Sequence, residues 1–102
     1  MNFTCSVSCV DDGATITPCG ELDLQATGEF RKALRAAATG EAITTVVVDL
    51  SSVTFIDTTA LGVLVAARAA AQRHGATFAV TNPGPMVTMV LTVSGLFDTL
   101  VG

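Results

Sequence analysis

The segment FIDTTALGVLV, residues 55–65, places an aspartate and two threonines between an apolar run and a stretch rich in Ala, Leu and Val. Side-chain oxygens of this kind cap helices, because they accept a hydrogen bond from an N–H group that the first turn leaves without a partner. The segment therefore predicts a helix that begins near Thr59 and is capped by Asp57 or Thr58. Since one cap would suffice, it also predicts a helix end that is polar and open.

Strand-like and helix-like patterns alternate on both sides of this segment. Apolar and polar residues alternate over 3–9, and the β-branched run at 46–48 is typical of a central strand covered on both faces. The expected elements are, in order, a hairpin over 3–9 and 14–20, a helix capped by Thr27 and ended by Gly40, a strand over 43–50, a helix over 59–74 stopped by Gly75, a strand over 76–80, a helix over 86–93 and a short last strand within 96–101. This order, β-β-α-β-α-β-α-β, predicts a single α/β domain over residues 1–102, with a mixed sheet of four to five strands and helices packed against it.

The composition excludes several classes of protein. The chain has 102 residues, of which 50% are apolar and 14% charged, with a net charge of -4, so it can bury one core and is not disordered. Its five cations fall in two expected helices and no Trp or Tyr accompanies them, which argues against a nucleic-acid partner. The longest apolar run, 60–67, is too short to span a bilayer, and residues 1–12 do not resemble a signal peptide. We therefore expect a cytoplasmic protein without membrane insertion.

The sequence also argues against catalysis. It contains no G-x-x-x-x-G-K-[ST] loop and no G-x-S-x-G motif, and His74 should lie more than ~20 Å from the threonines, at the far end of their helix. Asp49 and Asp57 could hold Mg²⁺, or one of them could accept a phosphoryl group, but no helper lysine accompanies them. The chain is predicted not to be an enzyme and to need no cofactor or metal.

The three cysteines, Cys5, Cys9 and Cys19, lack metal-site spacing. They are interpreted as small buried hydrophobes, with a reactive thiol as the alternative.

The start of the 59–74 helix is suited to reversible phosphorylation. The helix dipole and the free N–H groups of the first turn stabilise the added charge of a phosphate without unfolding the helix. A phosphothreonine here would change the surface potential and leave the fold intact.

A helical wheel divides this helix into two faces. The expected sheet-facing side consists of small residues, namely Ala60, Val63, Ala66, Ala67, Ala70 and Ala71. Leu61 and Val65 fall on the opposite stripe, beside the threonines, where they would form a docking surface. On the 86–93 helix, Met86 and Met89 are left outward if Val87, Val90 and Leu91 face the core; the alternative is that this short helix is buried all round.

The motifs, in this order, resemble the bacterial anti-sigma factor antagonists of the STAS fold. The segments that carry the resemblance are VVVDLS at 46–51, FIDTTALGVL at 55–64, GELDL at 20–24 and SGLFD at 94–98. The resemblance implies that the unphosphorylated protein binds an anti-sigma factor serine/threonine kinase and so releases the sigma factor. The kinase then phosphorylates Thr59, with Thr58 as the second choice, and a phosphatase reverses the modification. The residues expected to bind the partner are Glu21, Asp23, Asp57, Thr58, Ala60, Leu61, Gly62, Val65, Met86 and Met89.

The sequence departs from the family pattern in four places. Thr59 replaces the usual serine, Ala60 replaces the usual glycine, the third helix lacks the arginines often seen there, and the C-terminal helix of many relatives is absent or truncated. An alternative is therefore kept open: a STAS subunit of a lipid-transport ABC complex, in which the same helix start docks on the ATPase without being phosphorylated. A ligand-sensing domain is a third alternative, for which the sequence shows no polar pocket.

Overall fold

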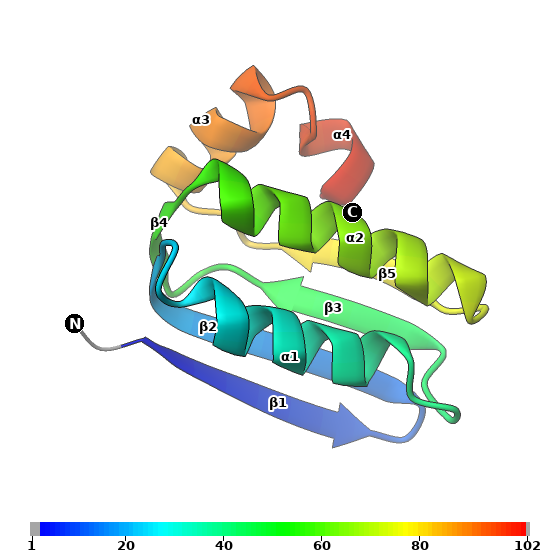
Figure 1. Ribbon diagram of the computed structural model, residues 1–102. Helices are drawn as coiled ribbons and strands as arrows, with labels where there is room; N and C mark the ends of the chain where they lie inside the picture. Colours follow the sequence, from blue (N-terminus) through cyan, green and yellow to red (C-terminus); the bar gives the residue numbers. More distant parts are fainter. Residues whose placement is uncertain (1–2, 102) are drawn as a thin grey trace.

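The computed structural model describes residues 3–101 and has the predicted α/β class, with a mixed sheet. Its elements are β1 (Thr4–Val10), β2 (Gly13–Leu22), α1 (Thr27–Ala38), β3 (Thr45–Asp49), β4 (Val53–Ile56), α2 (Thr58–Arg73), β5 (Thr77–Thr81), α3 (Pro85–Val93) and α4 (Phe97–Leu100). Helices α1 and α2 lie side by side on one face of the sheet (Figure 1), whereas α3 packs against β4, and α4 contacts α3, β5 and α2. Within the described residues, no helix is both long and apolar enough to cross a membrane.

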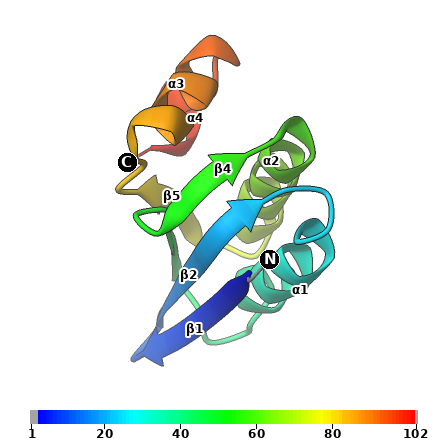
Figure 2. The same cartoon turned by 90° about the vertical axis from the view of Figure 1, so that its left-hand side faces the viewer.

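The long strand β2 organises the sheet. It pairs with β1 in an antiparallel hairpin, as predicted, and with β3 in parallel through its first half. Its second half pairs in parallel with β4, while β5 pairs in parallel with β3, so the strand order is β1-β2-β3-β5 with β4 off this path. An irregularity between Gly20 and Glu21, where Gly20 has φ 111°, lets β2 turn from one partner to the other. This change of direction places the end of β2 beside the loop that leads from β4 into α2 (Figure 2).

The core lies between the sheet and helices α1 and α2. Alternate residues of the strands point into it, such as Ile16, Val46 and Val48, and meet Phe30 and Leu64 from the helices. The prediction that β3 is covered on both faces is wrong at Val47, which is only partly buried, because α1 and α2 cover a single face of the sheet (Figure 2).

One predicted element and one predicted cap need correction, and the strand β4 was not among the expected elements. Residues 97–100 form the short helix α4 and not a final strand, and only Val101 forms a bridge, with Val80. The segment is too short for its pattern to decide between the two, and Leu100 is buried in the core from the helix. Thr27 does not cap α1: it is buried, its hydroxyl donates to the carbonyl oxygen of Asp23 at 2.8 Å, and the preceding turn is held by Asp23.

The predicted ends of α2 are confirmed. The helix begins at Thr58, one residue before the predicted start, and Asp57 is its N-cap. At the other end, Gly75 has φ 79° and stops the helix, and His74 sits at the C-terminus with Nδ1 3.0 Å from the carbonyl oxygen of Ala70.

Candidate functional site

The loop between β4 and α2 is fixed from both sides. The carboxylate of Asp57 accepts a hydrogen bond from the N–H of Ala60 at 2.9 Å, which satisfies one orphan donor of the helix. The N–H of Asp57 donates to the carbonyl oxygen of Leu22 at 3.2 Å, which ties the helix start to the end of β2. Asp57 therefore holds the start of α2 against the neighbouring loop and has a structural role that needs no partner.

Both threonines at the start of α2 are exposed. Within residues 3–101, the N–H groups of Thr58 and Thr59 have no acceptor, and neither hydroxyl is engaged in a hydrogen bond. Two free donors at the positive end of a sixteen-residue helix favour a negative charge at this place. The hydroxyl of Thr59 is thus accessible to an enzyme, and a phosphate on it would find unpaired N–H groups nearby.

The exposed surface that runs down α2 from the threonines is small and uncharged. It consists of Thr58, Thr59, Gly62, Val65 and Ala66, which we call the α2 strip. A Cβ atom added at Gly62 would meet nothing within 4 Å, so this glycine leaves an open, flat spot one turn from the threonines. No charged side chain belongs to the strip.

The wheel assigned Leu61 and Ala66 to the wrong faces. Leu61 is only 4% exposed, Ala60 is fully buried, and Ala66 is exposed. The reason is that α2 contacts three neighbours, α1, β5 and α4, so its buried arc is wider than a helix resting on a sheet alone would have. Neither Ala60 nor Leu61 can offer its side chain to a partner in this state, whereas Gly62 and Val65 can.

The loop between β2 and α1 lies beside the start of α2. Asp23 makes a tight turn there: its carboxylate accepts hydrogen bonds from the N–H groups of Gln25 and Ala26, each at 3.1 Å. This turn presents Leu24, whose side chain is 73% exposed. The loop thus offers a large apolar group on a backbone that is already ordered.

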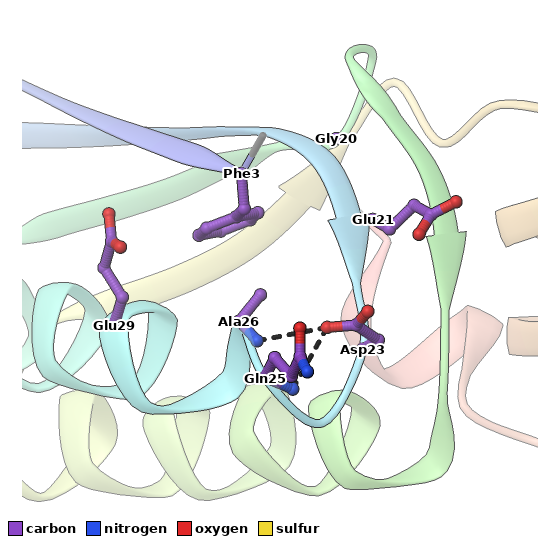
Figure 3. Close-up of a pocket in the computed structure, with 7 residues that line it drawn as sticks. All are labelled: Phe3, Gly20, Glu21, Asp23, Gln25, Ala26 and Glu29. Atoms are coloured by element: carbon purple, nitrogen blue, oxygen red, sulfur yellow. Dashed lines mark hydrogen bonds between the residues drawn. The ribbon is translucent and has the colours of Figure 1, made fainter. Parts of the chain in front are cut away.

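A cavity of about 350 Å³ opens next to this loop, as Figure 3 shows. It is lined by Phe3, Gly20, Glu21, Asp23, Gln25, Ala26 and Glu29. Glu29 projects from α1 on one side of the Phe3 ring, while Glu21 extends over β4 on the other side (Figure 3). Among the residues that the structure describes, the lining includes three carboxylates and no lysine or arginine. Glu21 and Asp23 thus both line this acidic hollow, with their carboxylates pointing in different directions, and α1 adds Glu29, which the sequence interpretation missed (Figure 3).

Helix α3 is two-sided, which decides against burial all round. Val87 and Leu91 are buried, Met86 is partly buried, and Met89 is 58% exposed. This helix packs against β4, from which Phe55 is also exposed. Sequence interpretation missed Phe55 and Leu24 as surface residues, because an apolar residue in a strand or after one is ordinarily assigned to the core.

Two groups outside this site have perturbed acidity. Burial raises the pKa of the Cys5 thiol, and the Glu29 carboxylate raises it further. The N–H of Ser51 donates to Asp49 at 2.9 Å and lowers the pKa of that carboxyl.

Cys9 and Cys19 are exposed, so the prediction that all three cysteines are buried is wrong. In residues 3–101, no three His, Cys, Asp or Glu side chains are grouped so as to hold a metal ion.

Comparisons with known proteins agree with this architecture. An anti-sigma factor antagonist from Mycobacterium paratuberculosis superposes with a TM-score of 0.84 at 24% identity, over 97% of this chain and 83% of its own. TM1081 from Thermotoga maritima, solved as a candidate anti-sigma factor antagonist, gives 0.84 at 26% identity, over 95% and 83%. The anti-sigma factor antagonist SpoIIAA gives 0.81 at 23% identity when unphosphorylated, over 98% and 86%. Its phosphorylated form, from Bacillus, gives 0.74 at 22% identity, over 98% and 89%.

A search among curated proteins found no match to the chain. A family model described as "Mlab, STAS domain" matches residues 5–102, which is nearly the whole length. The chain therefore belongs to the STAS domain family and has the fold of the anti-sigma factor antagonists.

Proposed function

We propose that this protein is an anti-sigma factor antagonist whose binding is controlled by phosphorylation of Thr59. In its unphosphorylated form it binds an anti-sigma factor serine/threonine kinase, and the sigma factor is released. The kinase phosphorylates Thr59, the complex dissociates, and a phosphatase restores the binding form. The observation that carries this proposal is the exposed Thr59 at a helix start with two unpaired N–H groups, inside a surface strip without charged side chains.

The same position explains why the modification would act as a switch. A phosphate at the start of α2 adds a charge of about -1.5 to -2, which the helix end tolerates. A partner seated on the α2 strip would have to remove water from that dianion, at a cost of several kcal/mol unless it supplied a cation. Each 1.4 kcal/mol lost from the binding free energy weakens binding about tenfold, so one phosphate is enough to dissociate a micromolar complex.

The acidic hollow indicates the charge of the partner. Glu21, Asp23 and Glu29 line it, and no lysine or arginine stands among the described lining residues, so a lysine or arginine from the partner would improve the local electrostatics. Leu24, which follows Asp23 in the chain, is an exposed apolar residue of the same loop. We expect the partner to present a basic side chain next to an apolar patch, with the basic group at the loop and the apolar patch on the α2 strip.

The comparisons support the proposal through a relative of the same fold. The structures of SpoIIAA include a phosphorylated form, so a protein of this fold accepts a phosphate. At 22% sequence identity, this likeness shows the fold. We infer that Thr59 is the phosphorylated residue in this chain because it is exposed.

The test is incubation with a cognate anti-sigma factor kinase and ATP, followed by mass spectrometry of the modified peptide and by titration of binding. We expect phosphate on Thr59, loss of binding for Thr59→Asp and Thr59→Glu, and retained binding for Thr59→Ala. The variant Thr99→Glu, which puts the same charge at an exposed threonine on α4, is the matched control and should bind like the unmodified chain. Equal binding by all of these variants would refute the switch.

A second candidate function is favoured by one substitution. The resemblance to the family leads us to expect a glycine where this chain has Ala60, and Ala60 is fully buried in this structure, so the helix start is packed well without any modification. The alternative is a STAS subunit of a lipid-transport ABC complex that docks on its ATPase through the same surface. No phosphate on Thr59 after incubation with the kinase, together with tight binding to an ATPase subunit, would favour this alternative.

A further inference from the structure

Strand β1 is a free sheet edge without the usual protection. Among the described residues it pairs with β2 alone, over seven residues from Thr4 to Val10. It contains no charged residue, no proline and no irregularity in its pairing, which are the features that ordinarily keep an edge from joining another strand. Val7 and Val10 are 49% and 69% exposed. The edge is therefore a template for a further strand.

The register of the hairpin decides which backbone groups are free. Val10 and Gly13 flank the two-residue turn Asp11–Asp12 and form the closing hydrogen-bonded pair, and hydrogen-bonded pairs alternate along an antiparallel ladder. Cys5, Val7 and Cys9 therefore direct their N–H and C=O groups away from β2. The partner of Cys5 is Pro18, which has no N–H to offer, in agreement with this alternation.

The sequence of this edge reads the same in both directions. Cys5-Ser6-Val7-Ser8-Cys9 is a palindrome centred on Val7. In an antiparallel pair of identical strands, a two-fold axis at the central residue places each residue opposite its counterpart. Val7 would face Val7 of the second copy, Cys5 would face Cys9, and Ser6 would face Ser8. All three outward-facing residues would then be hydrogen-bonded to the other copy.

We propose that the chain forms a two-fold dimer by antiparallel pairing of β1 with β1 of a second copy, centred on Val7. The sheets of the two copies become continuous, and the three outward residues of each copy exchange backbone hydrogen bonds with the other. The nearest acids, Asp11 and Asp12, lie in the turn beyond the strand, so no like charges face each other within the paired region. A foreign strand would lack this side-chain complementarity, which is why a second copy is the favoured occupant. The proposal is independent of the α2 strip.

Sedimentation equilibrium of the full chain under reducing conditions tests the association. We expect a mass that rises from monomer to dimer with concentration. Val7→Lys and Val7→Glu each place like charges directly opposite across the two-fold axis. The dimer dissociation constant of each variant should therefore be at least about fivefold higher than that of the unmodified chain. An equal mixture of the two variants should form a heterodimer, because only then do opposite charges meet. Val93→Lys, the same change at an exposed position on α3, should behave like the unmodified chain.

Amide hydrogen exchange of the unmodified chain tests the register without any substitution. The N–H groups of Cys5, Val7 and Cys9 should exchange fast in dilute solution and slowly in concentrated solution, whereas those of Ser6 and Ser8, bonded to β2, should be slow in both. A monomeric mass up to millimolar concentration would overturn the proposal. So would a dimer in which these three amides stay fast, or a mixture of the Lys and Glu variants that remains monomeric.

Discussion

At the scale of single residues, Asp57 illustrates what a sequence can predict. A carboxylate before a helical pattern caps the helix through a local hydrogen bond, and local chemistry is independent of the remaining fold. The bond from Ala60 to Asp57 confirms this expectation. The role of Asp23 in the turn before α1 was not predicted, because the sequence offered Thr27 as a cap of the same helix. In the structure Thr27 is buried, and Asp23 accepts the hydrogen bond from the N–H of Ala26.

The three thiols should differ in reactivity. Burial and the Glu29 carboxylate raise the pKa of Cys5, so at neutral pH its reactive thiolate is scarcer than that of an ordinary cysteine, while Cys9 and Cys19 are exposed. We predict that iodoacetamide modifies Cys9 and Cys19 well before Cys5, with peptide mass spectrometry following each site in dilute protein. Raising the pH should narrow the difference, since it restores thiolate at Cys5. In urea the three rates should become similar; equal rates in the folded protein would contradict the prediction.

At the scale of elements, strong periodicity was sufficient for α1, α2 and the hairpin, and failed where a segment was short. Residues 97–100 carry too few positions to distinguish a strand from a single helical turn. Leu61 was also wrongly assigned to the outward face of α2. A helical wheel describes how residues are spaced around the helix, and it contains no information on how many other elements the helix contacts. Because α2 contacts α1 and α4 as well as β5, more of its surface is covered than that of a helix on a bare sheet.

Gly62 provides a test that separates stability from binding. It is exposed in the interior of α2, has no neighbour near its missing Cβ, and so is expected to weaken the helix by about 0.5–1 kcal/mol relative to alanine. We predict that Gly62→Ala raises the free energy of unfolding by about that amount, measured by urea denaturation. The same methyl group would stand in the middle of the α2 strip, so binding to the kinase should weaken.

Ala66→Ser serves as the control for this substitution, because it adds one atom at an exposed position further along the strip. It should lower helix stability slightly and change binding less than Gly62→Ala does. If Gly62→Ala stabilises the fold and binds as well as the original chain, the partner does not approach α2 closely at this glycine.

At the scale of the whole molecule, the large apolar side chains that stay exposed come from separate parts of the chain. Leu24 belongs to the loop after β2, Phe55 to β4, Val65 to α2 and Met89 to α3, and each leaves a large apolar side chain exposed. Only Val65 and Met89 could be predicted to face outward, since each lies on a helix with a periodic pattern. The exposure of the other two depends on the path of β2 between β3 and β4, and no local pattern encodes that path.

The proposed switch requires that a negative charge at Thr59 alter binding and leave the fold intact, and this can be measured without any partner. Thr59 is the second residue of α2 and is exposed, so Thr59→Glu adds a carboxylate at the positive end of the helix, which should stabilise it by about 0.3–1 kcal/mol. Gln72→Glu adds the same charge in the last turn, where the dipole opposes it. We predict that thermal unfolding shifts up by a few degrees for the first variant and down for the second, and that salt reduces both shifts. If Thr59→Glu instead lowered the unfolding temperature strongly, its loss of binding would reflect a damaged fold, and a phosphate at this position could not act as a reversible signal.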